Sequence, residues 1–97
     1  MIKHIVLLNF KPTTTPQQIA EFSKTAYNTL KVLPGVKNLF VGKTMPVRGT
    51  PKYQFTLVMD FSDEATLDIY RKHPDHIKFA TEVLRPLVDE TVVLDFA

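Results

Sequence analysis

Three side chains able to move protons, Tyr70, His73 and His76, lie within one short segment of the chain. Pro74 fixes its own φ and pushes His73 out of the helical region, so we predict a helix that begins at Pro74 with His73 as its cap. His76 then lies in the first turn, where the positive helix end favours a neutral imidazole, although Asp75 acts in the opposite direction. A neutral imidazole beside a phenol is an acid/base pair at neutral pH. The spacing therefore indicates His76 and Tyr70 as candidate catalytic residues.

His4 is the third candidate catalytic residue. It alternates with the apolar residues of its own segment, Ile2, Val6, Leu8 and Phe10, and is predicted to point toward the protein interior. We expect His4, Tyr70 and His76 to converge on a cavity that takes a hydrophobic small molecule with one polar end. The substrate-binding residues predicted around it are Val6, Leu8, Leu57, His73, Phe79, Val83 and Leu84. In the alternative interpretation, these histidines and the tyrosine only pack or orient neighbouring groups.

Composition argues against several other kinds of site. The chain has no cysteine, which rules out disulfides, thiolate nucleophiles and cysteine-ligated metals. The three histidines lack the spacing of a metal site, and the three isolated glycines form no phosphate-binding loop, so we predict neither metal nor cofactor. Asp60, Asp89, Glu90 and Asp95 are expected to be solvated or interface charges rather than a paired-carboxylate site.

Charge and hydropathy narrow the choice of partners and location. The net charge of +2 is small and the basic residues are dispersed, which argues against nucleic acid as a partner. The apolar stretch at residues 5–8 is too short for a membrane span or a signal-peptide core. We therefore expect a cytoplasmic protein that does not bind membranes.

The chain is long enough for one small domain, residues 1–97. Short runs of alternating apolar residues predict strands over residues 2–10, 36–43, 52–61 and 90–96. Helices are predicted from Pro16 to Pro34, from a cap at Ser62 to Tyr70, and from Pro74 to Arg85, with Thr15 and Gln18 forming a capping box. The order β-α-β-β-α-α-β predicts an α+β, ferredoxin-like fold, in which the helices cover one face of a four-stranded antiparallel sheet.

The other face of this sheet has no helix to cover it. Its predicted residues mix apolar and polar types, and are Lys3, Ile5, Leu7 and Asn9 from the first strand and Gln54, Thr56, Val58 and Asp60 from the third. This mixture is too apolar to leave in water and is typical of a protein–protein interface. The sequence therefore predicts a homodimer that packs sheet against sheet.

Several segments together resemble the stress-responsive dimeric α/β-barrel domain family, often shortened to Dabb. These are the opening Lys3-His4-Ile5-Val6-Leu7, then Leu33-Pro34-Gly35-Val36, Tyr70 with His73-Pro74-Asp75-His76 and Phe79, Leu84-Arg85-Pro86-Leu87-Val88, and Leu94-Asp95-Phe96. The resemblance spans nearly the whole chain. It implies two ferredoxin-like subunits whose sheets form a dimeric α/β barrel, with a pocket between the sheet and helices of each subunit.

A plant branch of this family contains polyketide cyclases of the olivetolic acid type, which need no cofactor and close a ring by aldol chemistry. By that likeness, Tyr70 and His76 are the acid/base pair and His4 is an auxiliary polar group. Phe55 stands where that branch has a further pocket histidine, and Ser23 and Ala26 replace bulky pocket residues. Other relatives resemble stress-associated proteins without a defined activity, and some bind a divalent cation through backbone oxygens. The resemblance thus leaves two functions open: a cofactor-independent cyclase or lyase, and a non-catalytic small-molecule-binding dimer. A third function for the same barrel, a cofactor-free oxygenase, is indicated by no residue of this chain.

Overall fold

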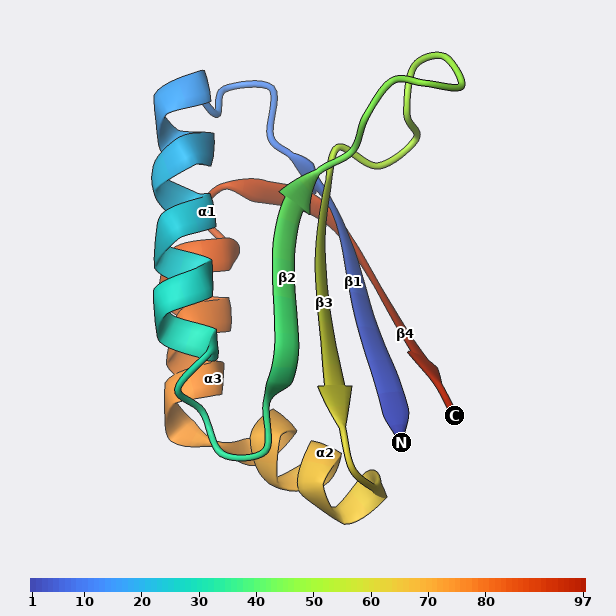
Figure 1. Cartoon of the computed structure of the whole chain (residues 1–97). Helices are drawn as coiled ribbons and strands as arrows, with labels where there is room; N and C mark the ends of the chain where they lie inside the picture. The colour runs from blue at the N-terminus through green and yellow to red at the C-terminus, as the bar shows by residue number, and fades with distance from the viewer.

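The computed structural model describes all residues, 1–97, as a single sheet with helices packed on one of its faces (Figure 1). The strands are β1 (Ile2–Phe10), β2 (Lys37–Lys43), β3 (Phe55–Phe61) and β4 (Val88–Phe96). The helices are α1 (Pro16–Leu30), α2 (Glu64–Lys72) and α3 (Pro74–Phe79), and α3 continues into a π-helical turn, η1 (Ala80–Leu84). No helix is both long enough and apolar enough to cross a membrane.

The strands lie in the order β2-β3-β1-β4, and every neighbouring pair is antiparallel. The two central strands of the sheet are thus β1 and β3. In the sequence, α1 and β2 lie between them, as the predicted ferredoxin-like arrangement requires. The register places His4 opposite Met59 on one side and opposite Asp95 on the other. The terminal strand β4 thus supplies the outer neighbour of the histidine on β1.

A side-chain cap fixes the residue at which each of the three helices begins. The predicted capping box at α1 is present: the Thr15 hydroxyl accepts from the Gln18 N–H, and the Gln18 side chain accepts from the Thr15 N–H. His73 also caps α3 as predicted, because its Nδ1 accepts from the Asp75 N–H at 3.1 Å. The prediction of Ser62 as the cap of α2 is wrong. Asp63 caps this helix, since its carboxylate accepts from both the N–H and the hydroxyl of Thr66.

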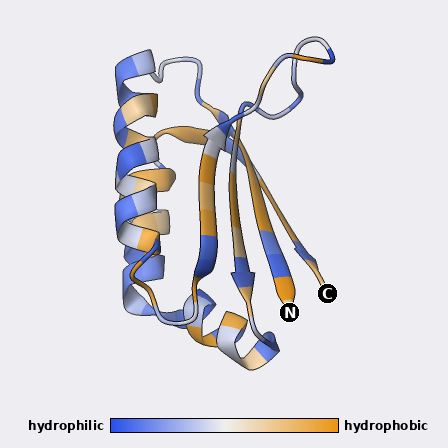
Figure 2. Ribbon diagram, in the orientation of Figure 1, coloured by the Kyte–Doolittle hydropathy of each residue, from blue (hydrophilic) through white to orange (hydrophobic).

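The core lies between the helices and the sheet. It contains the inward residues of β1 and β3 and the apolar stripe of α1, among them Leu8, Phe22, Ala26, Leu30, Met59 and Phe61, each at most 2% exposed. Helix α1 shows the corresponding alternation of polar and apolar bands in Figure 2. This packing fixes the distance between the helix layer and the strands, and hence the space available for a site between them.

No helix covers the opposite face of the sheet. Phe40, Val58, Ile5 and Leu94 are aligned across the four strands in one row of this face. Phe40 and Leu94 are 60% and 41% exposed in the single chain. Asp60, predicted as a solvated or interface charge, lies on this face; it is only 6% exposed in the single chain and lies 3.0 Å from both the Asn38 amide and the Lys3 ammonium. Those two groups lower the pKa of the Asp60 carboxyl.

Candidate active site between helices and sheet

A cavity of about 340 Å³ lies between the inner face of the sheet and helices α2 and α3. Fourteen residues line it, and eight of them are hydrophobic. Strand residues come from β1, β3 and β4, whereas α1 contributes a single leucine and the α2–α3–η1 segment contributes the remainder. The lining residues are His4, Val6, Leu30, Leu57, Tyr70, Arg71, Lys72, His76, Phe79, Ala80, Leu84, Thr91, Val93 and Asp95.

His4 reaches this cavity from the middle of the sheet. It is 5% exposed, and its Nδ1 lies 2.5 Å from a carboxylate oxygen of Asp95. Because an ionised carboxylate only accepts hydrogen bonds, Nδ1 is the protonated nitrogen and, in the neutral ring, Nε2 carries the free lone pair. Asp95, predicted as a solvated or interface charge, is indeed partly exposed, but its carboxylate also orients the buried histidine, a contact that the prediction lacked.

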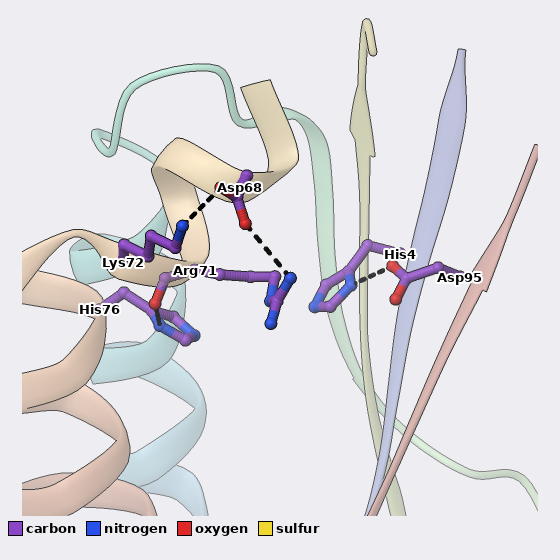
Figure 3. A network of polar contacts seen from close by, with 6 residues as sticks. All are labelled: His4, Asp68, Arg71, Lys72, His76 and Asp95. Carbon is purple, nitrogen blue, oxygen red and sulfur yellow. Dashed lines mark hydrogen bonds and ion pairs between the residues drawn. The ribbon is translucent and has the colours of Figure 1, made fainter. Parts of the chain in front are cut away.

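His76 approaches the same space from α3. Its Nδ1 lies 3.1 Å from the backbone carbonyl oxygen of Arg71, which also only accepts, so Nε2 is again the free nitrogen of the neutral ring. Figure 3 shows that the second nitrogens of His4 and His76 both turn toward the space between the helices and the sheet, where the Arg71 side chain also extends. The two imidazoles therefore face one cavity, each with Nδ1 held by an oxygen acceptor and Nε2 turned inward.

Burial lowers the pKa of His76 below its ordinary value. The carbonyl of Arg71 acts in the opposite direction by accepting from the ring, while electrostatic repulsion from His4, Arg71 and His73 adds to the lowering. The direction agrees with the sequence-based expectation of a neutral imidazole. The main cause is desolvation, however, rather than the field of the helix end.

Tyr70 lies in the helix layer between the two histidines. It is 2% exposed, and its ring centroid lies 4.4 Å from that of His76 and 5.9 Å from that of His4. Burial raises the pKa of the Tyr70 phenol, so the hydroxyl remains protonated at neutral pH. The rings of Tyr70 and His76 are thus in contact without a hydrogen bond between them, and the phenol is a donor rather than a base.

Seven of the ten predicted site residues line the cavity: His4, Val6, Leu57, Tyr70, His76, Phe79 and Leu84. Leu8, His73 and Val83 do not. Leu8 is fully buried within the core, His73 is used as a helix cap, and Val83 faces shallow hollows on the outer side of the helix layer. Phe55 packs edge-on against Phe10 and Phe22, so it also lies outside the cavity lining.

Sequence reasoning missed the charged residues of the site. Arg71 and Lys72 follow Tyr70 directly, and both line the cavity. Asp95 was missed because its role depends on the strand register, which places it opposite His4. Antiparallel pairing of the first and last strands would have predicted that contact. The structure contains no cluster of three His, Cys, Asp or Glu side chains arranged to bind a metal ion.

Two curated plant proteins are similar to this chain over almost its full length. Olivetolic acid cyclase of Cannabis sativa is 28% identical over 96 residues, which cover 98% of this chain and 94% of the cyclase. The stress-response A/B barrel domain-containing protein HS1 of Arabidopsis thaliana is also 28% identical, over 98% of this chain and 87% of its own length.

Solved structures agree with this relationship. A Dabb family protein with a ferredoxin-like fold from Mesorhizobium loti superposes with a TM-score of 0.87 at 25% identity, covering 99% of this chain and 94% of that protein. A dimeric ferredoxin-like protein from Thermobifida fusca gives a TM-score of 0.84 at 30% identity, covering 99% and 89%. The family model described as the stress responsive A/B barrel domain matches residues 2–97. The chain therefore belongs to the stress-responsive A/B barrel domain family.

Proposed function

We propose that this protein is a cofactor-independent cyclase or lyase that acts on a hydrophobic carbonyl compound in the cavity between its helices and sheet. One observation carries the proposal: the neutral imidazole of His76, fixed by the carbonyl of Arg71, turns Nε2 into a largely apolar cavity beside the Tyr70 phenol. A base of lowered pKa and a buried acid within one small cavity suit removal of a proton next to a carbonyl group. The similarity to olivetolic acid cyclase supports ring closure as the reaction.

In this proposal, Nε2 of His76 takes a proton from a methylene group between two carbonyls of the substrate. The resulting enolate attacks a second carbonyl carbon of the same molecule and forms the new carbon–carbon bond. Tyr70 donates its hydrogen bond to the carbonyl oxygen on which negative charge develops. The imidazolium then protonates the alkoxide formed at the attacked carbon. This hydroxyl leaves as water together with a proton from the neighbouring carbon, and enolisation of the remaining ring carbonyls makes the ring aromatic. No redox step occurs, so the reaction needs no electron carrier.

His4 supports this pair as a second imidazole held by Asp95. Because the carboxylate holds the proton on Nδ1, Nε2 of His4 accepts a hydrogen bond from an enol or from a bound water. The apolar wall formed by Val6, Leu57, Phe79 and Leu84 binds the hydrocarbon part of the substrate. His76, Tyr70 and His4 are therefore the proposed catalytic residues.

The test is ring closure of a linear alkyl poly-β-ketone thioester, followed through the absorbance of the aromatic product. His76→Ala should reduce the rate by about 10²–10⁴-fold, the usual contribution of a positioned general base. His73→Ala is the matched control, because His73 is a neighbouring histidine that caps α3 and does not line the cavity. A His76→Ala variant that closes the ring at the wild-type rate would overturn the assignment.

The packing around Tyr70 favours the second candidate function, a non-catalytic dimer that binds a hydrophobic compound. The phenol ring contacts His4, Phe61 and His76, and its hydroxyl makes no hydrogen bond within the chain. Under this alternative the histidines only shape the cavity. Recovery of a cavity-bound poly-β-ketone chemically unchanged after long incubation would favour binding without turnover.

We also propose that two copies pair through the open faces of their sheets to form the barrel. The apolar row from Phe40 to Leu94 and the dimeric state of the Thermobifida fusca relative support this arrangement. Ile5 lies in the middle of that row, so Ile5→Lys tests the proposed contact most directly, because it places a charge at its centre. Light scattering should give a dimer for the wild type at micromolar concentration and a monomer for Ile5→Lys. A monomeric wild type would contradict the proposal.

A further inference from the structure

Arg71 stands where the inner cavity meets a second hollow. An outer cleft of about 540 Å³ lies between α2 and the ends of β1 and β4. Only Arg71 and Asp95 line both this cleft and the inner cavity. The end of a ligand at the cleft side of the cavity would therefore lie close to one guanidinium and one carboxylate.

The guanidinium of Arg71 retains most of its hydrogen-bonding capacity. Its side chain is 61% exposed, and within the chain it makes a single hydrogen bond, from one terminal nitrogen to Asp68 at 3.3 Å. The other carboxylate oxygen of Asp68 accepts from Lys72 at 2.8 Å (Figure 3). One carboxylate is therefore paired with two cations, and the group of three side chains carries a net positive charge. Because a guanidinium has five N–H donors in a planar fork, several remain free for a ligand.

At Asp95, the other residue of this junction, one carboxylate oxygen is bound by His4 and the second makes no hydrogen bond within the chain. The free hydrogen-bond donors at the junction are therefore those of the Arg71 guanidinium. The cavity side has two cations, Arg71 and Lys72, against the single carboxylate of Asp95, whereas the cleft side adds the carboxylates of Glu64 and Asp68. An anionic group would be attracted to the cavity side of Arg71 and repelled from the outer cleft.

We propose that Arg71 is a specificity-determining residue that binds a carboxylate on the ligand, so that the site prefers an elongated hydrophobic carbonyl compound with an acidic end. This inference rests on the proposed function, because it takes the same cavity as the binding site. The planar guanidinium matches a carboxylate in a two-point contact, which an ammonium group cannot reproduce. The hydrocarbon part of the ligand then lies along Val6 and Leu57, deeper in the cavity.

The experiment compares decanoate with decan-1-ol, which have the same chain length and differ only in the acidic group. Binding is followed by the shifts of backbone amide signals around the cavity in ¹⁵N-labelled protein at neutral pH. Wild type should bind decanoate roughly fivefold to tenfold more tightly than decan-1-ol, as expected for a partly exposed charged contact. Arg71→Met should remove this preference and leave decan-1-ol binding unchanged.

Two further variants test the cause of the preference. Arg71→Lys keeps the charge without the fork and should retain only part of the preference. Lys24→Met removes a positive charge from the exposed side of α1 and should change nothing. If decan-1-ol binds and decanoate binds no better, or if Arg71→Met keeps the preference, carboxylate recognition is refuted while the hydrophobic cavity stands. If neither compound binds in the cavity of wild type, the proposed site fails as well.

Discussion

Replacing Tyr70 by Phe separates the chemical role of its hydroxyl from the packing role of its ring. The residue is 2% exposed, and its hydroxyl has no hydrogen-bond partner in the chain. The hydroxyl is not fully enclosed and opens onto the cavity, so its loss removes no hydrogen bond within the chain and relieves at most a partial desolvation cost. The ring contacts with Phe61 and His76 remain in Tyr70→Phe. We therefore expect the free energy of unfolding to stay equal or to rise by up to about 1 kcal/mol.

Urea unfolding followed by circular dichroism measures this change, with all variants at one protein concentration because the unfolding of an oligomer depends on concentration. Tyr53→Phe is the matched control. It removes an exposed hydroxyl that donates to Glu90 at 3.0 Å, and should lower stability by roughly 0.5 kcal/mol. A loss of more than about 1 kcal/mol in Tyr70→Phe would refute the reasoning, because it would mean that the hydroxyl has a strong structural partner. Slower ring closure in this stable variant would identify the phenol as catalytic.

Two more predictions concern the pH dependence and the turn before β2. Because the pKa of His76 is lowered by folding, the unfolded chain binds this proton more readily, so stability should fall as the pH drops below about 6.5. His76→Gln should flatten that part of the curve in unfolding experiments between pH 7.5 and 5.5, and an unchanged slope would contradict the burial argument. Gly35 has a φ of +83°, and a Cβ there would clash with the methyl group of Thr66 on α2. Gly35→Ala should cost about 1–3 kcal/mol in urea unfolding. Gly49→Ala, with a φ of +94° but open space around it, should cost less, and equal losses would show that the contact with Thr66 is unimportant.

Most of the fold follows from local patterns in the sequence. The alternation from Ile2 to Phe10 predicts β1 with the observed bounds, and the capping box predicts where α1 begins. The start of β3 was placed too early, at residue 52, because the alternation continues through Tyr53. In the structure the Asn9 side chain donates to the Lys52 carbonyl and accepts from the Gln54 N–H, which also donates to the Leu8 carbonyl of β1, and the strand begins at Phe55.

The candidate site was predictable only where its residues are close in sequence or share a strand face. Tyr70 and His76 are separated by a helix break that brings their rings together, and the side of β1 on which His4 lies follows from alternation. The partner of His4 could not be predicted in this way. Asp95 is distant in sequence, and only the pairing of β1 with β4 decides that it lies beside the imidazole. The position of Arg71 depends in turn on how α2 packs over the sheet.

The π-helical turn after α3 carries a consequence for how this cavity can vary. Its defining bond runs from the Arg85 N–H to the Ala80 carbonyl, so this turn holds one residue more than an α-helical turn. Ala80 and Leu84, at its two ends, both belong to the cavity wall. Deleting the extra residue here would restore α-helical bonding and shorten the stretch of cavity wall between Ala80 and Leu84. Segment length is thus a means of reshaping this cavity that leaves the strands, and the proposed pairing of subunits through them, untouched.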